Sequence, residues 1–233
     1  MKECVAKRAP MLREAAHFLV HAPGTLWLKA RLSQAELYDV LMGRAEERGL
    51  GEARAKLAGA AEGRVLEVGC GTGMLFAHYT DRANVVAIDT DEKFLERAKD
   101  RAKASKAAIE LAVGDVMGLP YPDGSFDEVV AFLVMCSVPD PAKALAECKR
   151  VLRPGGTLRL FEHVVSDDVV SAQMMRLLDP LWLAANGQGC HLDRDAVASV
   201  EAAGFNLGEV QKSQMWSPGL PAFPLRRITA HRP

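Results

Sequence analysis

Apolar positions along the chain follow two periodicities, and their order predicts a sheet flanked by helices. Continuous or β-branched apolar runs predict strands at residues 64–68, 84–88, 109–113, 126–134, 157–165, 205–216 and 225–231. Apolar spacings of three and four predict helices at residues 33–48, from Met74, and at 91–105, 140–152, 166–185 with a break at Pro180, and 193–203. Five strands alternate with helices, which indicates an α/β fold with a seven-stranded, mostly parallel sheet.

The segment before the first strand is helical and separate from this alternation. Ser33 and Glu36 form a capping-box pattern, and Gly49 ends the helix. We therefore expect residues 1–50 to be an N-terminal helical cover and residues 51–233 to be one α/β domain. The apolar run at residues 15–28 has 14 residues and is broken by Pro23-Gly24, so we expect no membrane-spanning segment and leave peripheral membrane contact open.

Composition narrows the kinds of partner. With 49% hydrophobic and 25% charged residues, the chain has the balance of a globular protein and is neither disordered nor a coiled coil. Its 29 basic and 30 acidic residues nearly cancel, so nothing indicates nucleic acid, and a small molecule is the expected partner. Five cysteines without CxxC or metal-ligand spacing predict a cytoplasmic protein and no metal site. The oligomeric state stays open.

The motif that carries chemistry is Glu67-Val68-Gly69-Cys70-Gly71-Thr72-Gly73, which ends the first strand. Its glycines let backbone amides approach a ligand closely. A dinucleotide fingerprint would need a small residue where this chain has Met74, and Glu67 would repel a pyrophosphate. Asp89 ends the second strand, where a carboxylate accepts hydrogen bonds from ribose hydroxyls. These residues predict a nucleoside ligand that carries a positive charge.

Further motifs follow in a fixed order, namely Gly114-Asp115, Phe126-Asp127 and Leu152-Arg153-Pro154-Gly155-Gly156. Together with the glycine motif and Asp89, they make residues 64–160 resemble the class I S-adenosylmethionine-dependent methyltransferases. The resemblance implies a Rossmann-like methyltransferase fold and S-adenosyl-L-methionine as cofactor. It implies these cofactor-binding residues: Gly69, Gly71 and Gly73 under the methionine part, Glu67 and the Ala131 backbone at the ammonium, Asp89 with Thr90 at the ribose, Asp115 and Val116 at the adenine, and Tyr38 over the carboxylate.

Downstream segments resemble a narrower group, the methyltransferase-like alkyl-thiol S-methyltransferases and their bacterial relatives. The segments are Cys136-Ser137, Phe161-Glu162-His163-Val164, Leu178-Asp179-Pro180-Leu181-Trp182 and Gly189-Cys190-His191-Leu192-Asp193-Arg194. This resemblance implies S-methylation of a small thiol by in-line displacement, with a substrate pocket formed by Met135, Cys136, Asp179, Trp182 and His191. His163 ends a strand at the edge that faces the ligand, so we expect it to be the catalytic base or to orient the substrate.

Each of these residues also has a structural interpretation. Glu67 and Asp115 alone are as well explained by a strand end and a turn, Tyr38 and Cys136 by core packing, and His163 by a hydrogen bond to the next helix. Two other functions stay open because similar cofactor domains serve many acceptors. One is N- or O-methylation of a lipid head-group amine or a quinone-like phenol, and the other is a non-catalytic cofactor-binding module.

Overall fold

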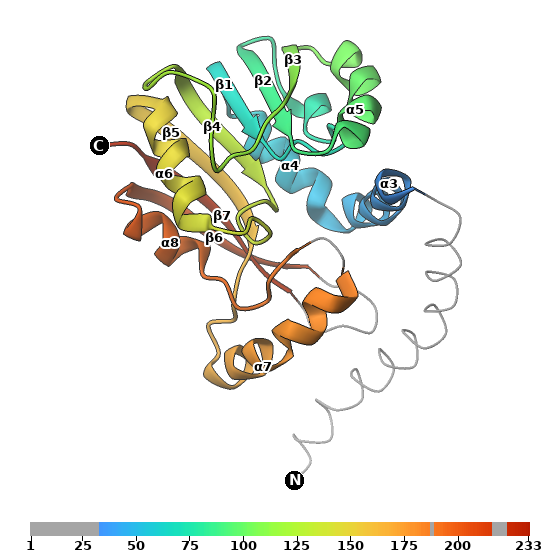
Figure 1. Cartoon of the computed structure of the whole chain (residues 1–233), viewed down its shortest axis with the longest axis vertical. Coiled ribbons are helices and arrows are strands. Elements are labelled where there is room, and N and C mark those ends of the chain that lie inside the picture. The colour runs from blue at the N-terminus through green and yellow to red at the C-terminus, as the bar shows by residue number, and fades with distance from the viewer. Residues whose placement is uncertain (1–32, 187–188, 216–222) are drawn as a thin grey trace.

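A seven-stranded sheet in the order β3-β2-β1-β4-β5-β7-β6 forms the centre of the fold (Figure 1). The computed structural model describes residues 33–186, 189–215 and 223–233. The strands are β1 (Gly63–Val68), β2 (Ala83–Asp89), β3 (Ala108–Val113), β4 (Phe126–Phe132), β5 (Leu152–His163), β6 (Asn206–Met215) and β7 (Phe223–His231). β1 to β5 pair in parallel, and β7 runs antiparallel between β5 and β6. The predicted fold class is confirmed.

The strand order reverses next to β1. β1 pairs with β2 on one side and β4 on the other, with Val68 beside Ala131 at the carboxyl end. The crossover that follows β1 therefore leads to β2 on one side, and the chain later returns to β4 on the opposite side. In open α/β sheets the ligand crevice lies outside the carboxyl ends of the strands at this reversal. The fold thus places the loops after β1 and β4 at one candidate site.

Helices cover both faces of the sheet (Figure 1). They are α3 (Gln34–Ala45), α4 (Gly51–Ala58), α5 (Glu92–Ala104), α6 (Pro141–Val151), α7 (Val169–Asn186) and α8 (Ala196–Ala202). α4 and α5 bury Leu57 and Leu95 in one apolar cluster, and α6 and α8 bury Leu145 and Val200 in the other. Because the sheet is covered on both faces, β4 is buried at every position except the half-buried Asp127, and its last four residues are all apolar.

The region after the glycine loop differs from the prediction. Where the sequence predicts a helix from Met74, the chain forms a turn over residues 71–75 and a single 3₁₀ turn, η2 (Phe76–His78). Gly73 has φ +79°, and Tyr79 is already extended with its ring fully buried, so too few residues remain for a longer helix before β2. In place of the helix expected behind the loop, there is therefore only a single 3₁₀ turn.

Two other helix boundaries also differ. α7 continues through Pro180, where a break is expected. Pro180 removes the donor for the carbonyl of Arg176, but Arg176 is exposed and water can solvate that carbonyl. α8 is capped by Asp195, whose side chain accepts from the Ala198 amide at 3.0 Å, and not by Asp193 as predicted.

The N-terminal cover is described in part. Ser33 and Glu36 form the predicted capping box of α3. The segment η1 (Glu46–Leu50) joins α3 to α4, and Gly49 turns the chain there with φ +113°. Residues 1–32 of the expected cover lie outside the described residues. None of the described helices has the length and apolar character needed to cross a membrane.

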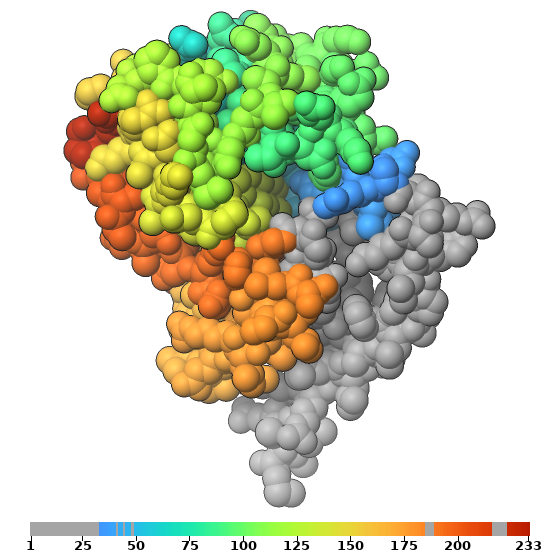
Figure 2. All heavy atoms as spheres, viewed as in Figure 1, coloured from blue at the N-terminus to red at the C-terminus, as the bar shows by residue number. Residues whose placement is uncertain are grey.

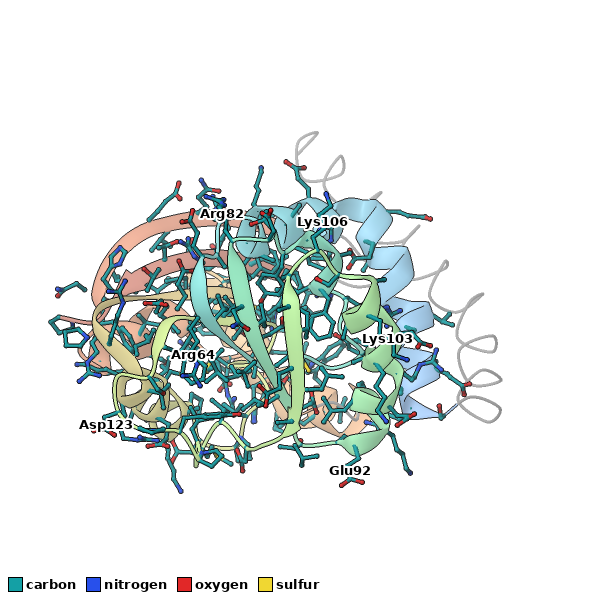
Figure 3. The ribbon with its side chains drawn as sticks, turned by 90° about the horizontal axis from the view of Figure 1, so that it is seen from above. Arg64, Arg82, Glu92, Lys103, Lys106 and Asp123 are labelled. Atoms are coloured by element: carbon teal, nitrogen blue, oxygen red, sulfur yellow. The ribbon has the colours of Figure 1, made fainter. Side chains whose placement is uncertain are left out.

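Charged side chains of both signs surround the sheet. Figure 3 shows the basic side chains of Arg82, Lys103 and Lys106 and the acidic side chains of Glu92 and Asp123 at separate places around the rim of the fold. This mixture agrees with the nearly balanced composition.

The core of the fold gives a direct stability prediction. Leu145 of α6 is fully buried against the sheet, so Leu145→Ala should lower the free energy of unfolding by about 2–5 kcal/mol, since the cavity cannot fully collapse. Leu177→Ala on α7 is the matched control, because Leu177 is 73% exposed and its change should stay within about 0.5 kcal/mol. Urea denaturation measures both. Equal losses for the two variants would contradict this assignment of the core.

Candidate active site

The glycine loop is packed directly against the loop that follows β4. A Cβ atom at Gly69 would lie 2.6 Å from Cγ2 of Val134, and Gly69 has φ +62°. Only glycine tolerates both the contact and the conformation. The two loops therefore approach each other as closely as backbone and one side chain allow.

Asp89 supports the glycine loop from the end of β2. Its Oδ2 accepts a hydrogen bond from the Gly71 amide at 2.8 Å, and its Oδ1 accepts one from the Asp91 amide at 3.0 Å. Asp89 is half-buried, and Thr90 beside it is exposed. A carboxylate has about four acceptor positions, so two remain for hydroxyl groups of a ligand. The arrangement is compatible with the expected ribose contact.

Glu67 is a buried carboxyl group with an unused oxygen. It is 2% exposed, and its Oε2 has no hydrogen-bond partner among the described residues. The Tyr79 hydroxyl is the polar group that interacts with this carboxyl group, and it has no other partner within that part of the chain. Burial raises the pKa of Glu67 to about 8, although the interaction with the Tyr79 hydroxyl and, after it, the positive charge of Arg54 oppose the shift. A buried acceptor without a partner is costly, and a cationic ligand group would satisfy it.

Asp39 connects α3 to the glycine loop and to α5 through hydrogen bonds. The Asp39 carboxylate accepts hydrogen bonds from the Thr72 hydroxyl at 2.6 Å and from Arg97 Nε at 3.0 Å, and it pairs with Arg101 at 3.2 Å. Burial opposes ionisation of Asp39, but these hydrogen bonds outweigh it and lower its pKa. No role of Asp39 was predicted from the sequence. Its spacing from Ser33 places it on the helix face that meets the loop.

Tyr38 lies beside the same loop. Its ring meets Phe94 edge-on with 5.5 Å between centroids, and a Cβ at Gly71 would be 3.9 Å from Tyr38 Cε1. Burial raises the pKa of the Tyr38 hydroxyl, and the positive charge of Arg54 opposes this shift. Tyr38 is thus close to the motif that the sequence paired it with, and its ligand contact stays a prediction.

The predicted adenine residues are less distinctive. Asp115 is exposed and its Oδ1 accepts from the Met117 amide at 2.8 Å, which is the hydrogen bond of a turn. Val116 is buried, and Ala131 is buried in β4 beside Val68. Their roles at the adenine and the ammonium stay predictions.

Two buried charged residues were not identified from the sequence. Glu162, fully buried at the end of β5, accepts hydrogen bonds from the amides of Val134 and Met135 at 3.0 Å and of Cys136 at 3.1 Å. Burial raises its pKa to about 7, and the three amides oppose this shift. Arg54 on α4 pairs with Glu46 at 2.6 Å and stacks over the Phe132 ring. An acid within the apolar run Phe161–Val164 was the available signal for Glu162, whereas nothing in the pattern marked Arg54.

Glu162 shapes the loop after β4 together with a strained residue. Leu133 has φ +60°, which costs about 1–2 kcal/mol for a residue with a Cβ. The Leu133 amide donates to the Phe161 carbonyl at 2.7 Å. The strain is tolerated because Glu162 and β5 hold the residues on either side of it.

The predicted acceptor residues converge around His191. Its amide donates to the Cys136 carbonyl at 2.8 Å, its carbonyl accepts from His163 Nδ1 at 3.2 Å, and its Nδ1 lies 2.9 Å from Asp179 Oδ2. Met135, Cys136 and His163 line one small pocket. Trp182 and His163 both pack on the Phe223 ring. Segments as remote along the chain as Met135 and Phe223 thus form one cluster, and its role as a substrate pocket stays a prediction.

Two thiols lie in this cluster. Cys190 Sγ is 3.7 Å from His163 Nδ1, and Cys136 is buried beside it. Hydrogen bonding from Cys136, followed by that from His163, lowers the pKa of Cys190, although burial opposes the shift. The same thiol–thiol contact, together with burial, raises the pKa of Cys136. The cluster therefore stabilises negative charge on sulfur at Cys190.

One group of described residues has metal-ligand geometry. Ligand atoms of Asp179, His191 and Asp193 lie within 4.8 Å of one another. The sequence predicts no metal site, because no cluster of carboxylates or histidines has ligand spacing along the chain. Asp179 already uses both oxygens, one towards His191 Nδ1 and one towards the Leu192 amide at 2.6 Å. These contacts explain the grouping without an ion.

Comparison with known proteins agrees with this geometry. The sequence profile described as "Methyltransferase domain" matches residues 66–160. These residues contain the glycine loop, Asp89 and the end of β4. Residues 66–160 are a class I S-adenosylmethionine-dependent methyltransferase domain.

Relatives of known activity extend the similarity beyond the methyltransferase domain. Over 160 residues the chain is 40% identical to the thiol S-methyltransferase TMT1B of Rattus norvegicus, covering 66% of this chain and 63% of that protein. Over 133 residues it is 35% identical to a phosphatidylethanolamine N-methyltransferase of Cereibacter sphaeroides, covering 56% of this chain and 65% of that protein. The chain thus spans less than two thirds of the length of these relatives.

A solved structure shares the fold. An S-adenosylmethionine-dependent methyltransferase of Mesorhizobium loti superposes with a TM-score of 0.57 at 22% identity, covering 81% of this chain and 98% of that one. The cofactor of the methyltransferase domain is S-adenosyl-L-methionine. The unpaired buried oxygen of Glu67 and the remaining acceptor positions of Asp89 fit its ammonium and ribose groups.

The pKa of Glu67 yields a test of its contact with the cofactor. At pH 7 a carboxyl group with a pKa of about 8 is mostly protonated. An ammonium group bound beside it favours the ionised form, so cofactor binding should release close to one proton per site. Calorimetry in two buffers of different ionisation enthalpy measures this number.

Two variants serve as comparison. Glu67→Gln should release almost no proton, whereas Glu110→Gln, on the exposed face of β3, should behave as the wild type. Proton release that is unchanged by Glu67→Gln would show that Glu67 does not meet the ammonium.

Proposed function

We propose that this protein transfers the methyl group of S-adenosylmethionine to the sulfur of a small thiol. The observation that carries the proposal is the 40% identity to a thiol S-methyltransferase, together with an acceptor cluster built from the same chain segments that carry this resemblance. Similar cofactor-binding loops serve enzymes that methylate many different substrates. The choice of a thiol therefore depends on the residues that surround the methyl-acceptor substrate.

The protein's part in the reaction is to bind the cofactor and to align the thiol with its methyl group. S-adenosylmethionine supplies a methyl group activated by a sulfonium. Glu67, Asp89 and the glycine loop would hold its charged and ribose parts, and α3, fastened through Asp39, covers the loop. Alignment of nucleophile and methyl group contributes most of the rate in such a displacement. The tight contact between Gly69 and Val134 suits this task, because it fixes the distance between donor and acceptor loops.

A thiol acceptor needs little help from the protein to become ionised. Its pKa is about 8.5, so a few per cent is ionised at neutral pH, and the thiolate is intrinsically nucleophilic. His163 is 4% exposed and its Nδ1 is committed to the His191 carbonyl. We therefore assign His163 the orienting half of its predicted role, since it fixes the segment that carries Cys190 and His191.

An acceptor panel tests the proposal. Labelled S-adenosylmethionine with alkyl thiols, amines, phenols and a phospholipid amine should give transfer to thiols at a kcat/KM at least tenfold above the other classes. Asp89→Ala should lower cofactor affinity about tenfold or more, because it removes a charged acceptor from the ribose and from the Gly71 amide.

The outcomes separate the three functions. Transfer to amines or phenols without thiols would replace S-methylation by N- or O-methylation. Cofactor binding without turnover on any acceptor would favour the non-catalytic module.

A lipid amine is the second candidate, and one surface favours it. α7 exposes a stripe of apolar side chains, and in Figure 2 this helix (orange) projects from the body of the fold. The exposed residues are Val169, Val170, Met174, Leu177, Leu178 and Leu181. Asp179 lies on the same helix and reaches the acceptor cluster, so a lipid surface at α7 would bring head groups close to it.

Vesicle flotation tests this candidate. If the acceptor is a lipid amine, the protein should float with vesicles of phosphatidylethanolamine and phosphatidylcholine, and replacing Leu177 and Leu181 by Glu should lower the bound fraction at least fivefold. Val113→Glu is the control, because Val113 is an exposed apolar residue on β3. Wild-type protein that stays with the soluble fraction would remove the lipid candidate.

A further inference from the structure

His191 makes three hydrogen bonds within the acceptor cluster. Its amide and carbonyl are bonded to Cys136 and His163, and its ring is bonded to Asp179. The side chain is nevertheless 30% exposed. A ring fixed at one nitrogen and accessible elsewhere is arranged to act on a bound molecule.

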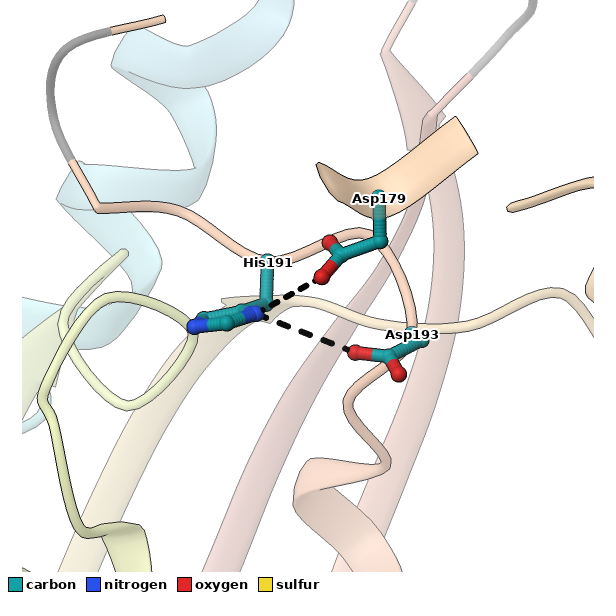
Figure 4. Close-up of side chains that lie close together, drawn as sticks. All are labelled: Asp179, His191 and Asp193. Atoms are coloured by element: carbon teal, nitrogen blue, oxygen red, sulfur yellow. Dashed lines mark hydrogen bonds and ion pairs between the residues drawn. The ribbon is translucent and has the colours of Figure 1, made fainter. Parts of the chain in front are cut away.

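The partners of Asp179 decide which ring nitrogen carries the proton. Asp179 is 7% exposed, and its two oxygens lie 2.9 Å from His191 Nδ1 and 2.6 Å from the Leu192 amide. A carboxylate only accepts hydrogen bonds, so Nδ1 must be the protonated nitrogen. In the neutral ring Nε2 then has a free lone pair. Figure 4 shows this nitrogen pointing away from both carboxylates.

A short chain of contacts connects His191 to the donor loop. Gly69 packs against Val134, and two residues later the Cys136 carbonyl accepts the His191 amide. Glu162 binds the amides of Val134 and Cys136 and keeps this loop in place. The imidazole is thus positioned relative to the glycine loop through the backbone of the loop after β4 and through the side chains of Val134, Glu162 and Asp179.

We propose that His191, oriented by Asp179, is the general base that takes the proton from the acceptor thiol. The inference rests on the proposed S-methylation and adds the residue that assists it. The thiol proton moves to Nε2, the sulfur electron pair forms the new bond to the methyl carbon, and the bond from that carbon to the sulfonium sulfur breaks with its electrons on that sulfur. The positive charge ends on the imidazolium, where the Asp179 carboxylate stabilises it.

Neighbouring groups are less suited to this task. His163 has the same protonated nitrogen facing a carbonyl, but its Nε2 is buried and has no partner in the described chain. Asp193 lies 4.0 Å from His191 Nδ1, beyond hydrogen-bond distance, and is exposed. Asp179 therefore acts as the positioning residue, and Asp193 offers a matched control.

The experiment compares acceptors of different acidity. His191→Gln and Asp179→Asn should lower kcat about 10²-fold for alkyl thiols, which need deprotonation, and less than about threefold for acidic thiols that are already ionised at the assay pH. Asp193→Asn should keep both rates within twofold of the wild type. Calorimetry should show S-adenosylmethionine affinity within twofold for all three variants.

A second measurement does not depend on turnover. Histidine ¹⁵N NMR of the protein without ligands should show His191 protonated at Nδ1 and bare at Nε2, and Asp179→Asn should shift this tautomer. Equal losses for acidic and alkyl thiols, or a proton on Nε2, would overturn the inference. Activity that requires a divalent cation bound by Asp179 and His191 would overturn it as well.

Failure of the proposed function gives a different result. If the wild type methylates amines or phenols and no thiol, S-methylation is wrong. The His191 tautomer measured by NMR still tests the inference in that case. If Nε2 already carries a proton, it cannot take one from any methyl-acceptor substrate.

Discussion

The close contact between the loops after β1 and β4 is the constraint on which the site depends. A side chain at Gly69 would collide with Val134, so the two loops keep one spacing. The parallel pairing of β1 with β4 brings the loops to the same edge, and the reversal of strand order leaves that edge open. Donor and acceptor sides of the site are therefore fixed to each other by backbone.

Two buried carboxyl groups in this region differ in how many hydrogen bonds the fold gives them. Glu162 is saturated by three amides and organises the loop after β4, including the strained Leu133. In the described part of the chain Glu67 Oε2 has no hydrogen-bond partner, and the Tyr79 hydroxyl is the polar group that interacts with this carboxyl group. Glu162 is therefore satisfied within the fold, whereas Glu67 has an oxygen available for the ligand contact that the sequence predicts. This difference separates their roles more clearly than burial, which they share.

Much of the fold could be predicted because its signals are local. Alternation of apolar runs with helical spacing gave the seven strands and the parallel order, and Asp140-Pro141 marked the start of α6 correctly. The helix expected after Met74 failed because the buried Tyr79 ends the turn, which is a tertiary effect that periodicity does not contain. The boundary at Asp193 failed for a similar reason. Two acids compete for the same cap, and the geometry of the chain selects Asp195.

The candidate site also has one part that local sequence signals predict and one part that only tertiary contacts reveal. By itself, the sequence determined the glycine loop, Glu67 and Asp89, because these residues are consecutive with strand ends that any parallel sheet places at one edge. The acceptor side depends on contacts between remote segments. Only the tertiary structure showed that Asp179 orients His191, that His163 is committed to a carbonyl, and that Arg54 and Glu162 are buried beside the site. Spacing along a chain cannot reveal these pairs, because their distances are set by how α7 and the loop before α8 pack on the carboxyl edge of the sheet.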